Sequence, residues 1–288
     1  TTEIYTLSLH DALPILGHGI AQVCAQSGFE VALGDVSDVQ LAKAVEKVRG
    51  SLEKLASKGK LDADVATILG RLTVSSAMDR VLEGADLVIE AVPEKMELKL
   101  ELFRTASVKA PPHAIFATNT SSLSVTEIAA DTGRSERVVG LHFFNPVPVM
   151  ELLEIVRGLS TDDATVDAAL AFARRIGKDP IVVKDWPGFA TSRLGIILGC
   201  EAIRMVEQGV ASPADIDKAM KLGYRHPMGP LELTDLVGLD VRLHIMEHLF
   251  AELGEQFRPP ALLRQMVRAG KLGDRKSTRL NSSHANIS

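Results

Sequence analysis

The sequence predicts an α/β domain with a doubly wound, mostly parallel sheet, followed by a second domain that is entirely helical. Between Phe29 and Lys184, short runs rich in β-branched residues alternate with longer stretches of helical spacing. The runs are apolar almost throughout, as expected for parallel strands that helices cover on both faces. From Pro187 onward no run has the character of a strand. We therefore expect two domains, residues 1–186 and 187–288.

The first domain should alternate strand and helix along its whole length. One helix face is marked by apolar residues from Leu41 to Leu55 at spacings of three and four, and "EKMELKLELFRTASVKA" predicts a further helix. A third helix, "DDATVDAALAFARRIG", separates the last two strands. The expected strands are "FEVALGD", "LTVSS", "ADLVIEAV", "HAIFATN", "RVVGLHFF", "MELLEIVRG" and "DPIVVKD".

The second domain should consist of helices with large apolar faces. "LGIILGCEAIRMVEQG" predicts a long helix that ends at Gly209, and a second helix should follow the Ser212–Pro213 start. The helical pattern of this domain continues in two further stretches, "LELTDLVGLDVRLHIMEHLFAEL" and "PPALLRQMVRAG". So much apolar helix surface suggests a homodimer interface, although packing within the domain explains it equally well.

The composition excludes several classes of partner. The 288 residues are 46% hydrophobic and 24% charged, an ordinary globular balance. A net charge of −5 does not favour nucleic acid or anionic membranes, and no apolar run reaches the length of a membrane helix. We expect a cytoplasmic protein without metal, in which Cys24 and Cys200 are buried as small apolar residues.

The two ends do not continue this pattern. "TTEIYTLSLHDALPI" and "DRKSTRLNSSHANIS" resemble translated sequencing-adapter sequence. We therefore expect native sequence from about Leu16 to Gly273, with residues 1–15 and 274–288 foreign to the protein. The "EIYTLSL" run still has an alternation that could fill the place of a first strand.

Half of a dinucleotide-binding loop stands near the N-terminus. Gly17 has the place of the third glycine of the fingerprint, with Gly19 two residues further, but Ala12 and Pro14 occupy the first two glycine places. A Cβ hinders a turn that needs positive φ, and proline removes an N–H donor, so we expect impaired cofactor binding. Helix packing would explain Gly17 and Gly19 as well. Asp35 follows the next strand, where an acid accepts ribose hydroxyls of NAD and repels the extra phosphate of NADP, although turn formation is its commoner role.

A histidine and a glutamate suggest an acid–base pair. His142 lies near the end of an apolar strand, and Glu154 interrupts the apolar run "ELLEIV". A half-buried carboxylate needs a partner, and a carboxylate that fixes the tautomer of a histidine makes it a base for an alcohol proton. Taken singly, each residue is more simply explained as structural.

Five stretches together resemble the 3-hydroxyacyl-CoA dehydrogenase family, especially bacterial 3-hydroxybutyryl-CoA dehydrogenases, over residues 16–273. They are "EAVPEKMELKLELF", "TNTSSL", "HFFNPVPVMELLEI", "PGFATSRL" and "GYRHPMGPLELTDLVGLD". The resemblance implies a Rossmann-type NAD domain, a helical dimerisation domain, and NAD-dependent oxidation of L-3-hydroxyacyl-CoA in fatty acid or butanoate metabolism.

Carried over by position, the resemblance implies that His142 is the base and Glu154 its orienting partner. Ser121 would bond the substrate oxygen, and Asn145 would position the substrate. Cofactor contacts would come from Glu94, Lys99 and Asn119. Without the resemblance, Ser121 is a helix cap, Asn145 a turn residue, and Glu94 and Lys99 solvated helix charges.

The acyl-CoA substrate would meet both domains. Residues 41–60 hold six Lys or Arg against two Glu, and Ser51, Lys54 and Lys58 share one face of a helix. The resemblance makes Ser51 and Lys58 candidates for binding CoA, whereas a solvated helix face is the alternative. Ser192 stands where the family usually has asparagine and is a weaker candidate for the substrate carbonyl.

Two other functions fit the same residues. The scaffold could act on a free hydroxy acid, as gulonate dehydrogenases do, but the basic helix argues against that. It could be a non-catalytic relative, as lens λ-crystallins are, but a structural role needs none of His142, Glu154 and Ser121.

Overall fold

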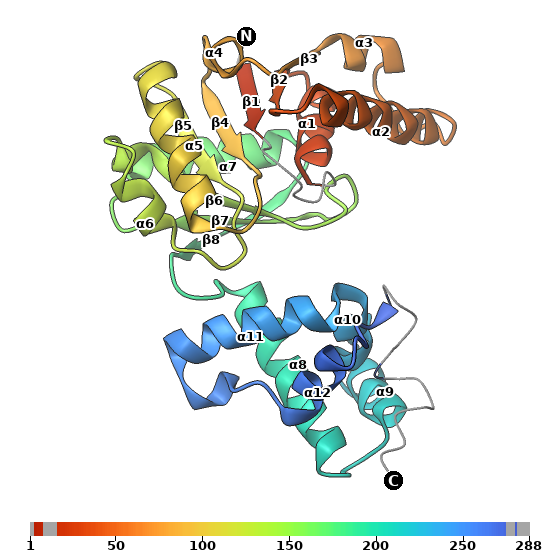
Figure 1. Cartoon of the computed structure of the whole chain (residues 1–288). Coiled ribbons are helices and arrows are strands. Elements are labelled where there is room, and N and C mark those ends of the chain that lie inside the picture. Colours follow the sequence, from red (N-terminus) through yellow and green to blue (C-terminus); the bar gives the residue numbers. More distant parts are fainter. Residues whose placement is uncertain (1–2, 8–15, 275–279, 281–288) are drawn as a thin grey trace. The chain divides into compact units, whose positions relative to one another are not determined.

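The computed structural model describes residues 3–7, 16–274 and 280, and the chain divides into two compact units, Thr1–Trp186 and Pro187–Ser288 (Figure 1). Each unit is described by itself. Within the described residues, no helix combines the length and the apolar character needed to cross a membrane.

The first unit is built on one sheet with the strand order β3-β2-β1-β4-β5-β6-β7-β8. All neighbouring strands are parallel except the antiparallel pair β6 and β7. The chain moves outward from β1 on one side and returns to β4 on the other, which confirms the predicted doubly wound topology. The strands are β1 (Glu3–Leu7), β2 (Glu30–Gly34), β3 (Leu72–Ser75), β4 (Leu87–Glu90), β5 (Ile115–Thr118), β6 (Val138–Phe143), β7 (Leu152–Arg157) and β8 (Asp179–Lys184).

Helices connect these strands and bury their apolar faces against the sheet. On α2, Leu41, Val48 and Leu52 join the main core cluster, which includes Ile20 of α1 and Leu141 of β6. The N-terminal run expected to fill the first strand place does so, because β1 pairs with both β2 and β4. The helices are α1 (Leu16–Gln26), α2 (Asp38–Ala56), α3 (Val65–Gly70), α4 (Met78–Leu82), α5 (Met96–Lys109), α6 (Val125–Ala130), the 3₁₀ helix η1 (Ser135–Arg137) and α7 (Asp163–Arg175).

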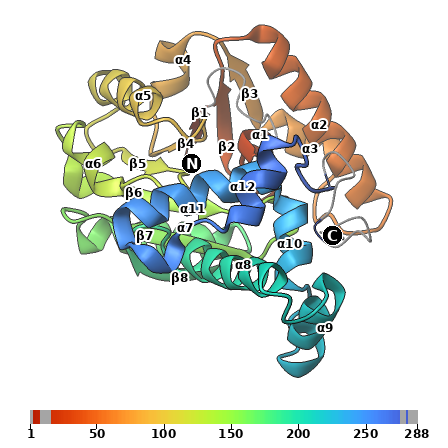
Figure 2. The same cartoon turned by 60° about the horizontal axis from the view of Figure 1, so that its bottom comes forward.

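The second unit is built from helices, and no strand element occurs among its described residues. Its central helix α8 packs against α10, α11 and α12 (Figure 2). The run from Leu231 to Leu253 forms two helices rather than one, because Gly238 between them has a φ of 105°, a backbone conformation that no helix interior allows. The elements are α8 (Thr191–Glu207), α9 (Pro213–Gly223), α10 (Pro230–Val237), α11 (Leu239–Leu253), the 3₁₀ helix η2 (Glu255–Phe257) and α12 (Ala261–Arg268).

Local signals explain where these helices start. Ser212 caps α9 by accepting a hydrogen bond from Asp215 N at 3.2 Å, as the Ser–Pro start predicts.

Cys24 and Cys200 are both fully buried, which confirms the burial expected for them.

Candidate active site

The candidate base and its partner face each other across two strands. His142 on β6 stands directly opposite Glu154 on antiparallel β7, and His142 Nδ1 lies 2.6 Å from Glu154 Oε2. Both side chains are buried, with residue exposures of 7% and 0%. Because a carboxylate only accepts, Nδ1 carries the hydrogen of this bond, and Nε2 is the ring atom that can take up a proton.

The sequence builds this pair through strand register. Every residue of β6 is buried, so the strand lies inside the sheet, and its antiparallel neighbour fixes which residue lies opposite. The ring of Phe144 lies against the imidazole, with ring centroids 4.5 Å apart. The pair stands where β6 ends, at the carboxyl edge of the parallel strands, where open α/β sheets bind their ligands.

A second cluster gathers around the carboxylate of Glu94. Its Oε1 accepts hydrogen bonds from Thr120 Oγ1 at 2.6 Å, Ser121 N at 2.8 Å and Ser122 N at 3.0 Å. The hydroxyl of Ser121 also donates to it, at 3.2 Å. The carboxylate therefore shapes the loop that carries Ser121.

The reading of Ser121 as a helix cap is wrong. Ser124 caps α6, because its Oγ accepts a hydrogen bond from Glu127 N at 3.2 Å. Since the helix starts three residues later than that reading requires, Ser121 belongs to the loop that Glu94 organises.

Lys99 is not a solvated charge, because it is buried in an ion pair. Its side chain is fully buried, and Nζ donates to both carboxylate oxygens of Glu90, at 2.8 and 2.9 Å. It also lies 3.5 Å from Glu94 Oε2. The ammonium group therefore lies between the carboxylates of Glu90 and Glu94. The solvated reading fails for Glu94 as well, since only 29% of its side chain is exposed.

The two acids around Lys99 respond to burial differently. Complete burial raises the pKa of Glu90, against the opposing effect of Lys99 and of hydrogen bonds from Thr118 and Val92. Burial also acts to raise the pKa of Glu94, but Lys99 and the donors of the Thr120–Ser122 loop outweigh it and lower that pKa. Since every neighbour of Glu90 named here donates to it, the contacts favour its ionised form.

Sequence reasoning missed Glu90. It ends β4 in the run "LVIE", where all four residues are buried. An acid inside an otherwise apolar strand is the same signal that singled out Glu154, so the sequence did offer a way to find it.

Asn119 ties three strand ends together. Its backbone N donates to Glu90 O at 2.8 Å, and its side-chain oxygen accepts from Phe143 N at 2.9 Å, next to His142. At 9% exposure it serves as a brace between β4, β5 and β6. Asn145, in contrast, is exposed in the loop that follows His142.

Gly17 and Gly19, the two glycines that remain of the dinucleotide-binding fingerprint, have different surroundings. Gly17 and Asp35 line a small hollow of about 20 Å³ together with His18, Leu33 and residues of α2. Asp35 also accepts a hydrogen bond from Ser37 N at 2.9 Å, which is the turn role expected for it. Gly19 packs instead: a Cβ there would lie 3.0 Å from Val147 Cβ. Ala12 and Pro14 lie outside the described residues.

Comparison with known proteins decides the family. The model of the 3-hydroxyacyl-CoA dehydrogenase NAD-binding domain matches residues 14–186, and that of the C-terminal domain matches residues 188–281. The chain belongs to the 3-hydroxyacyl-CoA dehydrogenase family.

Individual members of the family match nearly the whole chain. It is 46% identical to the probable 3-hydroxybutyryl-CoA dehydrogenase of Bacillus subtilis over 260 residues, 90% of each protein. It is 44% identical to the 3-hydroxybutyryl-CoA dehydrogenase of Bradyrhizobium diazoefficiens over 266 residues, 92% of this chain and 90% of the relative. The crystal structure of (S)-3-hydroxybutyryl-CoA dehydrogenase from Ralstonia eutropha superposes with a TM-score of 0.92 at 41% identity, covering 97% of this chain and 98% of that one.

Two of the three substrate candidates lie at α2, and the third lies on α8. Ser51 is half-buried on α2 and Lys58 is exposed, but Lys58 is not on the helix, which ends at Ala56 with Ser57 as its C-cap. The prediction that Lys58 shares a helix face with Ser51 is therefore wrong. Ser192, partly exposed, lies in the first turn of α8 in the second unit.

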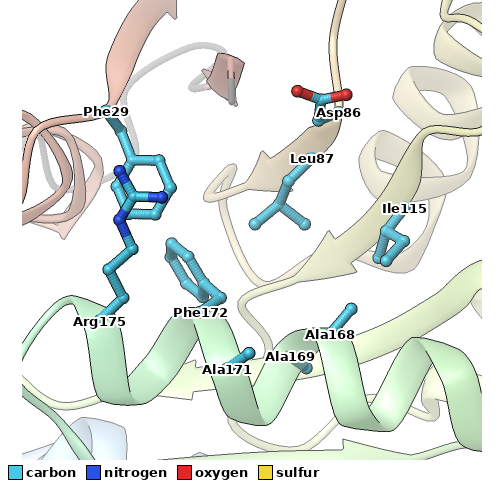
Figure 3. Close-up of a pocket in the computed structure, with 9 residues that line it drawn as sticks. All are labelled: Phe29, Asp86, Leu87, Ile115, Ala168, Ala169, Ala171, Phe172 and Arg175. Atoms are coloured by element: carbon cyan, nitrogen blue, oxygen red, sulfur yellow. The ribbon is translucent and has the colours of Figure 1, made fainter. Parts of the chain in front are cut away.

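Another hollow, of about 310 Å³, belongs to the opposite edge of the sheet. Leu87 and Ile115 line it where β4 and β5 begin, together with Phe29 and Phe172 (Figure 3). The guanidinium of Arg175 lies over the Phe29 ring, 3.9 Å from its centroid. Since it opens at the amino ends of these strands, it is separate from the candidate site. The described residues hold no group of three or more side chains suited to a metal ion.

Proposed function

We propose that this chain oxidises a short L-3-hydroxyacyl-CoA, such as 3-hydroxybutyryl-CoA, to the 3-ketoacyl-CoA in fatty acid or butanoate metabolism. The family and its named members support NAD-dependent oxidation of a 3-hydroxyacyl-CoA. The observation that carries the chemistry is the buried hydrogen bond between His142 and Glu154. It provides a base with a fixed tautomer at the ligand-binding edge of the sheet.

The reaction needs two acceptors, one for a proton and one for a hydride. The acceptor for the hydride from C3 of the substrate would be supplied by the nicotinamide of bound NAD. His142 accepts the hydroxyl proton at Nε2, and the C3–O bond becomes a carbonyl. Glu154 stabilises the positive imidazolium that results, in a buried setting where electrostatic effects are strong. Ser121 bonds the substrate oxygen, and Asn145 positions the substrate beside the base.

The first unit offers residues that fit NAD. The hollow beside Gly17 is lined by the carboxylate of Asp35 at the end of β2, the place where a ribose hydroxyl is bound in this fold. Glu94 and Asn119 act near the end of β5, and Lys99 acts through Glu94. We propose that Ala12 and Pro14 weaken NAD binding by removing a flexible turn and an N–H donor.

The remaining contacts belong to the proposal on the basis of the family alone. Ser51 and Lys58 would meet the nucleotide of CoA, and Ser192 the acyl carbonyl. We also propose that the protein is cytoplasmic and forms a homodimer through the helical unit. Sedimentation of the purified protein tests whether it is a dimer.

The deciding experiment measures NADH consumption with acetoacetyl-CoA and, separately, with free acetoacetate. We expect turnover of the CoA ester that falls by about 10²–10⁴-fold in His142→Gln, because the general base is lost. His113→Gln is the matched control, since His113 pairs with Asp86 on the surface away from the pair. Equal turnover of the free acid would favour a free hydroxy acid as substrate. If neither acetoacetyl-CoA nor acetoacetate is turned over at saturating NADH, the chain is a non-catalytic relative.

Cofactor affinity is tested separately. Titration calorimetry of NAD should show tighter binding by Ala12→Gly/Pro14→Gly than by the parent chain. A regained N–H bond to a charged phosphate is worth about 1.5–3 kcal/mol, or roughly 10–100-fold in Kd. Equal affinities would reject the idea that the loop is impaired.

A further inference from the structure

The loop between β6 and β7, residues 144–151, extends directly from the strand of His142 and carries Asn145. Most of it is exposed, and only Val147, at 1% exposure, is buried. Within the loop, Val149 N and Met150 N both donate to Pro146 O at 3.0 Å, which closes a tight turn. A turn with so little buried surface needs an anchor if Asn145 is to keep one position.

Lys178 provides that anchor from a distant part of the chain. It directly precedes β8 and is only 9% exposed. Its Nζ donates to Val147 O at 2.5 Å and to Met150 O at 2.7 Å. The ammonium group therefore holds the two ends of the turn that Pro146 closes.

An ammonium placed this way has a cost that its contacts must offset. Burial lowers the pKa of Lys178, against the opposing effect of Glu151 and Cys24 nearby. A buried charge persists only where hydrogen bonds compensate the loss of water. The two short hydrogen bonds from Lys178 Nζ to carbonyl oxygens compensate the loss of hydration. The charged group therefore binds backbone atoms of the loop and not a ligand.

The other side of the loop rests on the helix of the cofactor site. A Cβ on Gly19 would lie 3.0 Å from Val147 Cβ and 3.2 Å from Val147 Cγ2. Val147 therefore sits against α1 in a space that only glycine leaves open, while its carbonyl is held by Lys178. One buried residue connects the helix that carries Gly17 to the loop that carries Asn145.

We propose that Lys178 is a positioning residue for the proposed dehydrogenase reaction, holding the loop 144–151 so that Asn145 keeps its place relative to His142 and α1. The assignment rests on the proposed function. Lys178 touches backbone atoms of the loop, so it acts through Asn145 and not on the substrate itself.

The test compares Lys178→Met with Lys184→Met in the full-length chain. Methionine keeps most of the buried apolar stem of Lys178 but removes the donors to both carbonyls. Lys184 ends the same strand with an exposed side chain and is the matched control. We measure kcat and KM with acetoacetyl-CoA at saturating NADH, thermal unfolding, and amide hydrogen exchange.

The expected result is specific to the loop. Exchange at Val149 and Met150 should accelerate in Lys178→Met while exchange in β6 stays unchanged, because only the turn loses its anchor. The kcat value should fall by about 10–100-fold at temperatures well below unfolding, since misplacement by about 1 Å is enough for such a loss. Lys178→Arg, which keeps the charge and donors, should recover part of it.

Three outcomes would overturn the assignment. Unchanged exchange at Val149 and Met150 would show that something else holds the loop. Faster exchange with unchanged kcat would make Lys178 a purely structural residue. Absence of turnover in both the parent and Lys184→Met would overturn the proposed function and this assignment with it. This outcome differs from failure of the assignment alone, in which the parent chain is active.

Discussion

Replacement of Glu154 by glutamine isolates the charge of the acid–base pair. The amide has nearly the shape of the carboxylate and can still accept a hydrogen bond from His142 Nδ1, so the packing between β6 and β7 is kept. What disappears is the negative charge beside the imidazolium that would form in the proposed reaction, when His142 takes the alcohol proton. The substitution therefore tests electrostatic stabilisation in the transition state rather than the fold.

The size of the effect follows from the geometry. His142 Nδ1 and Glu154 Oε2 are 2.6 Å apart, so the centres of the two delocalised charges are about 4 Å apart. At an effective dielectric constant of about 20, the interaction is worth about 4 kcal/mol. Each 1.4 kcal/mol corresponds to a factor of ten, so kcat should fall by about 10³-fold.

The assay is NADH consumption with saturating acetoacetyl-CoA, compared with Glu101→Gln, which removes an exposed carboxylate on α5. The KM value should change little, because Glu154 is fully buried and contacts the histidine at Nδ1, not at Nε2. A fall in kcat of less than about tenfold would refute the electrostatic reasoning, since it would assign the charge less than 1.4 kcal/mol.

Three further changes test other parts of the structure. Gly140→Ala should lower the free energy of unfolding by about 1–3 kcal/mol in denaturant titrations, because the added Cβ would lie 2.7 Å from Val156 Cβ; unchanged stability would mean that the strands move apart at no cost. Asp217→Ala should cost about 1–3 kcal/mol by thermal unfolding, because this buried carboxylate accepts two amide N–H groups at the start of α10 at 2.8 and 3.0 Å, whereas exposed Asp215→Ala should cost less. The pKa of Glu94 is lowered in the folded state, so its stabilisation is complete above its ordinary pKa of 4.5 and is lost as the pH falls through the lower folded value. Unfolding titrations should therefore show a larger acid-induced loss of stability for the parent than for Glu94→Gln, and equal losses would contradict the assignment.

The acid–base pair could be predicted from the sequence because it depends on local patterns. A strand repeats every two residues, and a short turn between two strands fixes which residues lie opposite. His142 and Glu154 both interrupt apolar runs that are strands in any reading of the sequence. Their pairing needs only that the two strands be neighbours, which a connection of this length favours.

The cluster around Lys99 could not be predicted in the same way. Lys99 lies on α5 two residues from Glu97 and from Glu101, a pattern that a solvated, charged helix also shows. Whether its ammonium group is buried depends on how closely α5 approaches the end of β4, which no local pattern records. The prediction that α2 reaches Lys58 failed for a similar reason. The basic run of the sequence continues past Ala56, but the helix ends there.

Two glutamates are fully buried among the described residues, Glu90 and Glu154, and they differ in the partner that each one faces. Glu90 accepts two hydrogen bonds from Lys99 Nζ, and this buried pair holds the end of β4 against α5. Glu154 faces an imidazole, which becomes a cation only when it takes up a proton. In the proposed reaction, Glu154 would therefore gain most of its electrostatic compensation during proton transfer, so that a costly buried charge would stabilise the transition state.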